Sequence, residues 1–453
     1  MSFQSDIALL TGSISYFVLH KILHRGGTSF PGKIAYKIDK NLLKSFSKKV
    51  QTVIISGTNG KTLTTALIAR VLRKTGRLIV TNPSGSNMIQ GIFSTFIVNF
   101  NKIKKCLKAN KKPILVFEVD EANVKEISSS LKPDFFILTN IFRDQMDRYG
   151  EIYTTYNKIT EGIKKSPKAL VIANGDSPIL ARKNYPNRVV YYGFSSHGKN
   201  KDLRPPINTD GILAPNGKQV LHYHFINYSN LGDYFTIDKS FFRPPLKYQI
   251  NKIDQLTPSR SIFEIEGKKF MLPIGGLYNT YNALAAYAVG REFNISKEQI
   301  FLALNEDSRI FGRQEQLKFK NHLITIMLVK NPVGANAVID MMLTDRNVFS
   351  LVMLLNAHYA DGIDTSWIFD AQFEKLHKAK LKKLIIGGQR YKDFSVRMKM
   401  AGFKDQIIIR GFEGLIDKIK QLPTKNVYVI ATYTSMLMFR EALAKQNLVK
   451  ESF

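Results

Sequence analysis

The chain has 453 residues, 44% of them hydrophobic and 23% charged, which is the composition of a globular protein of two or three domains. Its single cysteine, Cys106, excludes internal disulfides and thiolate metal clusters and favours a reducing cytoplasm. The net charge of +30 favours an anionic partner, namely nucleic acid, a membrane surface or a phosphorylated substrate, unless it reflects only a lysine-rich background. Because the lysines are spread along the chain without a basic-aromatic module, we expect no nucleic-acid partner.

Residues 1–45 are predicted to form an N-terminal helical lead-in. Residues 7–19 are apolar but too short to span a bilayer, no convincing signal peptide is present, and Lys21, His24 and Arg25 follow. Two interpretations stay open for this segment. The helix packs on the protein's own core, or it lies as an amphipathic helix on the inner membrane face.

From residue 50 to 195, short apolar runs alternate with helical patterns. Strands are predicted at 52–56, 77–81, 113–119, 134–139, 169–173 and 188–193. Such alternation predicts an α/β fold with a parallel sheet covered by helices on both faces. We assign it to a central domain, residues 46–317, with ligands at the carboxyl ends of the strands.

The first of these strands runs into a glycine-bracketed turn and a helix, the arrangement of a nucleoside-triphosphate phosphate loop. Gly57 and Gly60 allow the backbone to approach phosphate, Lys61 supplies a point charge and Thr62 a hydroxyl for Mg²⁺. The general signature has an earlier glycine where Ile55 stands, so an ordinary turn between strand and helix is the alternative. The predicted nucleotide-binding residues of the loop are Gly57, Thr58, Asn59, Gly60, Lys61 and Thr62.

The rest of the chain divides into an insertion and a second α/β unit. Residues 196–247, rich in proline, tyrosine and phenylalanine, predict a small β-rich insertion, followed by a hairpin at 260–273 and helices at 279–292 and 297–305. A separate C-terminal α/β domain, residues 318–453, is predicted with strands at 322–328, 349–355, 382–387, 406–409 and 427–431.

Polar side chains follow two further strands of the central domain. Glu118 ends the strand at 113–119, where a carboxylate suits Mg²⁺, and Thr139-Asn140 with Asp144 follow the next strand. Each group alone could be a solvated loop. Because the carboxyl ends of parallel strands meet at one edge of the sheet, we expect these groups to lie near the phosphate loop.

Together these motifs resemble the ATP-binding core of the Mur ligase superfamily. Asn279–Ala286 and Gly312-Arg313-Gln314-Glu315 are similar to its nucleotide-contacting segments. Gln145, in Arg143–Gly150, stands where most members carry a metal-binding histidine. That segment, Lys330–Gly334 and Asn356–Trp367 resemble one branch, the MurT-type ligase subunits of lipid II isoglutaminyl synthase, over nearly the whole chain.

This resemblance implies a two-subunit enzyme of peptidoglycan synthesis. A GatD-type glutamine amidotransferase partner would release ammonia, and this chain would use ATP and Mg²⁺ to phosphorylate the α-carboxyl of D-glutamate in the lipid II stem peptide. Ammonia would then form D-isoglutamine. Because lipid II lies in a membrane, the resemblance also implies a cytoplasmic protein that is peripheral to the inner face of the cell membrane.

The resemblance also assigns roles to single residues. Lys61 and Thr62 would bind phosphate and Mg²⁺, Glu118 would be a second metal ligand, and Asn282 and Arg313 would contact nucleotide. Asp364 matches the acid that the family lends to the catalytic Cys and His of its partner. Its alternative role is to cap a turn or helix, because Asp-Thr-Ser before a helix suits capping.

The insertion departs from the family's pattern. MurT-type chains usually carry a zinc ribbon there, whereas all four ligand positions are non-cysteine here, at Ala214–Gly217 and Thr236–Phe241. We predict a ribbon-shaped insertion without zinc, held by Tyr and Phe packing, with His222 and His224 as surface residues.

The sequence disfavours two alternatives to the amidating ligase. A conventional Mur or folylpolyglutamate-type amino-acid ligase is disfavoured by Gln145 and by the segment Asp361–Trp367. The second alternative is a non-catalytic nucleotide-binding scaffold, with nucleic acid as the partner that the charge would suggest. It is disfavoured by the intact Lys61, Thr62, Glu118 and Arg313.

Overall fold

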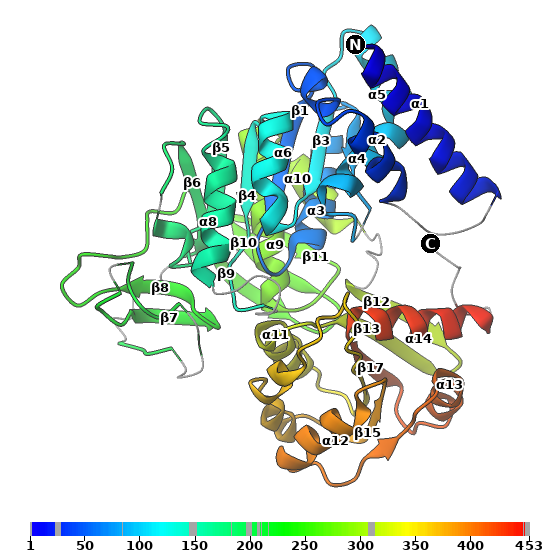
Figure 1. Cartoon of the computed structure of the whole chain (residues 1–453). Helices are drawn as coiled ribbons and strands as arrows, with labels where there is room; N and C mark the ends of the chain where they lie inside the picture. The colour runs from blue at the N-terminus through cyan, green and yellow to red at the C-terminus, as the bar shows by residue number, and fades with distance from the viewer. Residues whose placement is uncertain are drawn as a thin grey trace.

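The computed structural model describes residues 2–22, 29–83, 85–144, 152–182, 184–195, 202–205, 209, 211–215, 217–306, 313–446 and 448. Two α/β units built on separate sheets are joined near residues 306–313, and Figure 1 shows the second unit below the first. The α/β fold with a largely parallel central sheet that was expected from the sequence is confirmed. No helix among the described residues is both long and apolar enough to cross a membrane.

The central sheet has nine strands in the order β11-β10-β9-β6-β5-β4-β1-β3-β2. Its strands β2 to β6 and β1 run parallel, and β9 pairs antiparallel with β10, which pairs antiparallel with β11. The bounds are β1 Gln51–Ser56, β2 Ile79–Thr81, β3 Ile114–Glu118, β4 Phe135–Leu138, β5 Leu170–Asn174, β6 Val189–Phe194, β9 Tyr248–Leu256, β10 Ser261–Ile265 and β11 Lys268–Leu272.

Buried side chains alternate between the two faces of this sheet, as the two-residue period of a strand requires. Val53 and Ile55 face the cluster formed with α3 (Lys61–Arg73), α9 (Leu277–Glu292) and α10 (Lys297–Asn305). Ile54 faces the opposite cluster. The helices of that second face are α1 Phe3–Phe17, α2 Phe30–Ile38, α4 Ile89–Val98, α5 Phe100–Lys108, α6 Val124–Leu131 and α8 Ile152–Ile163.

The C-terminal sheet has six strands in the order β12-β13-β17-β14-β15-β16. Its bounds are β12 Arg313–Phe319, β13 His322–Leu328, β14 Phe349–Leu354, β15 Leu381–Gly387, β16 Ile407–Ile408 and β17 Asn426–Ala431. Strands β13 to β17 pair in parallel, and β12 is an antiparallel edge. The helices are α11 Pro332–Met342 and α12 Tyr391–Met400 on one face, and α13 Phe412–Lys420 and α14 Tyr433–Lys445 on the other.

Two strands were missing from the expectations, β9 and β12. Strand β12 begins at Arg313 and pairs with β13, so the second sheet recruits residues ahead of the expected domain start at 318. Strand β9 intersperses apolar residues with charged and amide ones, and β12 begins with four polar residues. Both strands therefore lack the apolar runs that marked the other strands.

The insertion folds as a small hairpin, β7 His222–Tyr228 and β8 Leu231–Phe235. Its own core contains Tyr223 and Tyr234, and Tyr234 stacks on Phe241 with ring centroids 5.5 Å apart. Aromatic packing of this kind was expected. The surface placement of His222 was wrong, because its ring is buried and pairs with Asp202 at 2.6 Å.

Candidate active site

The loop between β1 and α3 has the backbone that its two glycines allow. Gly57 has φ +130° and Gly60 has φ +85°, values that residues with a Cβ rarely adopt. A Cβ on Gly57 would lie 2.4 Å from Thr139 Oγ1, and one on Gly60 would lie 2.3 Å from Asn282 Oδ1. Both positions therefore require glycine for space as well as for conformation.

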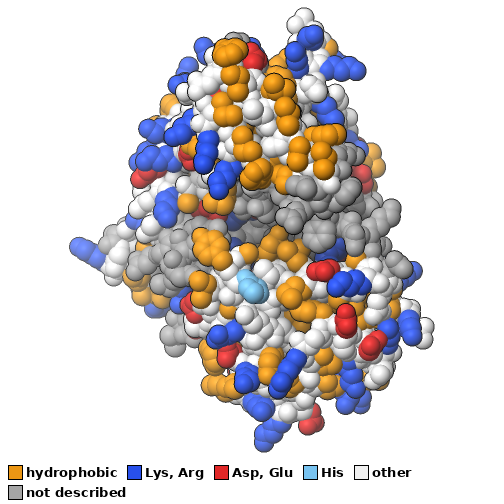
Figure 2. Space-filling model, turned by 45° about the vertical axis from the view of Figure 1, so that its right-hand side comes forward, with side chains coloured by type: hydrophobic (Ala, Val, Ile, Leu, Met, Phe, Trp, Pro, Cys, Tyr) orange, Lys and Arg blue, Asp and Glu red, His pale blue; other side chains and the backbone are white. Residues whose placement is uncertain are grey.

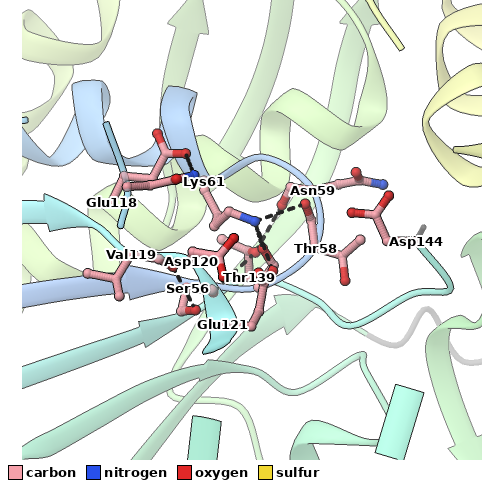
Figure 3. A network of polar contacts seen from close by, with 12 residues as sticks. Ser56, Thr58, Asn59, Lys61, Glu118, Val119, Asp120, Glu121, Thr139 and Asp144 are labelled. Carbon is pink, nitrogen blue, oxygen red and sulfur yellow. Dashed lines mark hydrogen bonds and ion pairs between the residues drawn. The ribbon is translucent and has the colours of Figure 1, made fainter. Parts of the chain in front are cut away.

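The end of β4 holds this loop in place. The Thr58 N–H donates to the Asn140 carbonyl (2.8 Å), and the Asn59 N–H donates to Asn140 Oδ1 (2.9 Å). Thr139 Oγ1 donates to the Asn59 carbonyl at 2.9 Å. The expected meeting of these polar groups with the phosphate loop is thus observed, and Figure 3 shows Thr139 beside Asn59 and Thr58.

Lys61, the first residue of α3, is buried inside the loop. Its Nζ donates to the carbonyls of Gly57 and Thr58, the latter at 3.3 Å, and lies 2.8 Å from Glu121 Oε1 (Figure 3). Burial lowers the pKa of Lys61, but attraction to Glu121 and its acidic neighbours outweighs it, so the pKa is raised. The Lys61 side chain is therefore a charged ammonium, and the Glu121 carboxylate is its anionic partner.

Glu118 lies at the carboxyl end of β3. Because β3 is the neighbour of β1 in the sheet, this end lies next to the strand that leads into the loop. Asn82 donates to its carbonyl and accepts from its N–H, both at 2.9 Å, and Asn87 Nδ2 lies 3.2 Å from its Oε1. Thr62 is half-buried in the first turn of α3. A carboxylate and a hydroxyl are hard oxygen donors that fit Mg²⁺ beside phosphate.

No group of three or more His, Cys, Asp or Glu in the described part of the chain is placed to hold a metal by itself. A Mg²⁺ ion at Glu118 and Thr62 would therefore need oxygens from the nucleotide to complete its shell, as such ions usually do. The two metal-ligand assignments stay predictions.

Side chains of the C-terminal domain reach this edge of the central sheet. Asn59 and Asn331 exchange two side-chain hydrogen bonds, at 3.3 and 3.0 Å. Lys330 forms an ion pair with Asp144. Burial raises the pKa of Asp144, but the Lys330 ammonium outweighs it and holds the pKa below its usual range. Arg143 and Asp370 form a further ion pair across the junction.

A cavity of about 80 Å³ lies between the loop, α9 and α11. Asn282, from α9, lines it and accepts a hydrogen bond from Thr64 Oγ1 at 3.1 Å. Gln314 closes it from β12, with Oε1 accepting the Gly275 N–H at 2.9 Å. The structure therefore brings Asn282 to the phosphate loop, and its contact with nucleotide stays a prediction. The side chain of Arg313, together with Gly312 and Gln145, lies outside the described residues.

Asp364 lies elsewhere, on the exposed surface that follows β14. Its Oδ1 accepts the Ser366 N–H at 2.8 Å, and its Oδ2 accepts from Ser366 Oγ at 2.9 Å, just ahead of the short 3-10 helix Ser366–Phe369. The turn-capping role is thus observed. Exposure leaves the same carboxylate accessible to another chain.

Three contact residues had been given no role, namely Glu121, Lys330 and Asn331. Asn-Pro at the start of α11 was a readable helix-start signal, and Asn331 Oδ1 indeed accepts the Gly334 N–H at 2.8 Å. The contact partners of these three residues could not be predicted from the sequence, because each contact joins two elements that are far apart along the chain.

Comparison with known families matches both sheet-containing parts of the chain. Residues 55–290 match the Mur ligase middle domain, and residues 328–436 match the MurT ligase C-terminal domain. The MurT subunit of lipid II isoglutaminyl synthase (glutamine-hydrolyzing) from Streptococcus pneumoniae is 42% identical over 453 residues, covering 100% of this chain and 99% of that protein. The chain belongs to the MurT family of Mur ligases.

A second MurT subunit, from Staphylococcus aureus strain COL, is 35% identical over 84% of this chain and 85% of its own length. Among solved structures, MurF from Thermotoga maritima in complex with ADP superposes with a TM-score of 0.60 at 16% identity, covering 89% of this chain and 83% of that one. A pseudomurein peptide ligase type C from Methanothermus fervidus has a TM-score of 0.65 at 20% identity, covering 89% and 80%. These two likenesses establish the fold of the MurT-family chain.

Proposed function

We propose that this chain is the ATP-using ligase subunit of a glutamine-hydrolysing lipid II isoglutaminyl synthase. The reaction converts the α-carboxyl of D-glutamate in the lipid II stem peptide to the amide of D-isoglutamine. The observation that supports it most is the intact phosphate loop, with Lys61 buried and charged, in a chain related over its full length to MurT subunits.

A carboxylate resists attack by ammonia because an oxide is a poor leaving group. Transfer of the γ-phosphoryl group of ATP to the carboxylate releases ADP and forms an acyl phosphate. Ammonia then attacks the acyl carbon, the C–O bond breaks, and phosphate leaves with the amide formed and a proton released. The protein's part in phosphoryl transfer is mainly positioning and charge neutralisation.

Lys61 is the residue placed for that neutralisation. Its ammonium contacts Glu121 and two loop carbonyls, and in the proposed reaction phosphate oxygens would replace Glu121 as its anionic partner. Mg²⁺, held by Thr62, Glu118 and the phosphates, would supply further positive charge against the transferring group. Gly57, Thr58, Asn59 and Gly60 would surround the phosphates, and Asn282 and Arg313 would contact the nucleoside.

The nitrogen source is proposed to be a GatD-type glutamine amidotransferase subunit in a heterodimer. The relatives are named as subunits of a glutamine-hydrolysing synthase, and this chain offers an exposed carboxylate at Asp364. That carboxylate would orient the histidine of the partner's Cys-His pair. We further propose that the enzyme works at the inner face of the cell membrane, where its lipid-linked substrate lies.

Reconstitution tests the proposal. The chain, co-expressed with a GatD-type subunit, should amidate lipid II in the presence of ATP, Mg²⁺ and glutamine, with one amide formed per ADP released. Lys61→Ala should abolish the reaction, and Lys158→Ala, far along the chain on α8, serves as the matched lysine control. Transfer of an amino acid in place of ammonia would instead identify a conventional Mur-type ligase.

A further inference from the structure

The outer face of α1 exposes a row of large apolar side chains. Phe3 is 81% exposed, Leu10 61% and Phe17 57%, and Ile7 and Ile14 complete the row. Single exposed apolar residues are normal on a protein surface, but a contiguous row marks an interaction site. We call these five residues the α1 row.

The α1 row lies opposite the buried side of the helix. Its members are spaced by four or three residues, which places them on one face of a helix with about 3.6 residues per turn. Ser5, Ala8, Leu9 and Gly12 are buried on the other face, where a Cβ on Gly12 would lie 2.7 Å from Ile97. Mostly small residues thus face the protein, with Leu9 as the exception, and five large apolar residues face outward. A helix whose only partner is its own core would show the reverse.

Lysines are frequent on the segments next to α1. A hollow of about 680 Å³ beside the start of α1 is lined by Asp6 and, among others, Lys49, Lys104, Lys108, Lys111 and Lys112. The sequence from Phe100 to Lys112 has no acidic residue. Lys33, Lys37 and Lys40, in and after α2, are exposed as well, and α2 packs directly on α1. Figure 2 shows apolar side chains gathered over the upper part of the molecule, with lysines and arginines along one side.

We propose that the α1 row inserts into the headgroup region of an anionic lipid bilayer, with the helix parallel to the membrane and the α2 and α5 lysines on acidic headgroups. The choice of a bilayer rests on the proposed function, whose substrate is a membrane lipid. An apolar helix face flanked by lysines is the pattern of interfacial helices. A helix of 15 residues spans about 22 Å, too little to cross the hydrocarbon core.

Charge argues against a second copy of this chain as the occupant. A two-fold dimer through the α1 row would place the same lysine-rich surroundings of both copies against each other, and like charges repel. An anionic surface instead attracts those lysines while it accepts the apolar side chains.

Vesicle flotation of the full chain, without lipid II or ATP, tests the inference. The chain should bind vesicles that contain phosphatidylglycerol at least about tenfold more tightly than vesicles of phosphatidylcholine alone, and added salt should weaken the binding. The triple change Leu10→Gln, Ile14→Gln and Phe17→Gln should lower binding at least about tenfold. Lys104→Gln with Lys108→Gln and Lys112→Gln should remove the preference for the anionic lipid.

The matched control is Val396→Gln with Met400→Gln, which replaces two exposed apolar residues on α12, 52% and 68% exposed, and should leave binding unchanged. If the triple variant does not fold, vesicle binding is measured with Leu10→Gln alone and with the triple lysine variant. Full binding by the α1 variants, or no binding by wild type, overturns the inference. Two further results would overturn it when vesicles are not bound. One is a dimer that the α1 changes abolish, and the other is binding of the amidotransferase subunit to the α1 row that the same changes abolish.

Amidation of a water-soluble stem-peptide analogue separates this inference from the proposed function. The α1 variants should amidate the soluble analogue at the wild-type rate and should be slower only on vesicle-embedded lipid II. Wild type that binds vesicles but does not amidate the analogue would refute the function and leave the docking surface standing.

Discussion

Asn59 in the phosphate loop and Asn331 at the start of α11 exchange two side-chain hydrogen bonds across 272 residues of sequence. Asn331 uses the same side chain to cap α11 through the Gly334 N–H. One buried residue thus ties the nucleotide loop of the central domain to the first turn of a C-terminal helix. The position of the phosphate loop is therefore coupled through Asn331 to the position of the C-terminal domain.

Asn331→Ala tests this coupling. Loss of the cap should lower the free energy of unfolding by about 1–2 kcal/mol, and loss of both bonds to Asn59 should raise the KM for ATP. Urea unfolding and initial-rate kinetics measure the two effects. Asn347→Ala, in an exposed turn of the same domain, should change neither. An unchanged KM in Asn331→Ala would show that the loop does not depend on this contact.

Glu121→Gln should remove the charged partner of Lys61. The buried ammonium is then poorly compensated, so we expect the free energy of unfolding to fall by about 1–3 kcal/mol. Phosphate oxygens can supply the missing charge, so a non-hydrolysable ATP analogue should raise the melting temperature more in the variant than in wild type. Glu413→Gln, exposed on α13, is the control. Equal ligand-induced shifts would contradict the exchange of partners at Lys61.

Asp364→Asn should separate the two nitrogen sources. Its carboxylate makes only local turn contacts among the described residues, so folding should change by less than about 0.5 kcal/mol. Glutamine-dependent amidation should be lost while part of the ammonia-dependent rate remains, because in the proposed heterodimer Asp364 acts only on the partner's histidine. Asp393→Asn, on α12, controls for loss of a surface carboxylate. Intact glutaminase activity in Asp364→Asn would refute the shared site.

Asp176 should make stability depend on pH. Burial raises its pKa to about 6, against the attraction of Arg243 and hydrogen bonds from Tyr281 and the Phe194 N–H. Because the folded pKa lies above the unfolded one, its contribution is fully present below about pH 4 and is lost as pH rises through about 6. The stability of wild type minus that of Asp176→Asn should therefore be about 1 kcal/mol greater at pH 5 than at pH 7.5. A difference that grows with pH would contradict this assignment.

The insertion should be independent of zinc. Its described core is aromatic, and Arg243 joins it to the central domain through Asp176 at 2.8 Å and Asp233 at 3.2 Å. A zinc-selective chelator should leave the melting temperature unchanged, and elemental analysis should find no zinc in the purified chain. Tyr234→Ala should expose the β7 and β8 amides to hydrogen exchange, whereas Tyr359→Ala, 74% exposed, should not. Loss of stability on chelation would overturn the metal-free assignment.

Local signals predicted most of the fold. Strand β1, the glycine turn and α3 lie within 23 consecutive residues, Gln51–Arg73, and each follows from apolar run, turn chemistry and helix pattern. The missed strands β9 and β12 lie where these signals fail. Both strands are rich in polar side chains and form by pairing, β9 with β10 and β6, and β12 with β13. A window of ten residues does not reveal such pairing.

The sequence by itself determined the chemistry, namely a phosphate loop with its lysine, an acidic strand end, an acid at residue 364 and an insertion without cysteine. Only the tertiary structure decided the partners: Glu121 for Lys61, Asn331 for Asn59, and Asp202 for the buried His222. Residue types and turn geometry are encoded within a few positions. Contacts over 20, 60 or 272 residues depend on strand order and on the docking of two domains, and these follow from the packing of the whole chain.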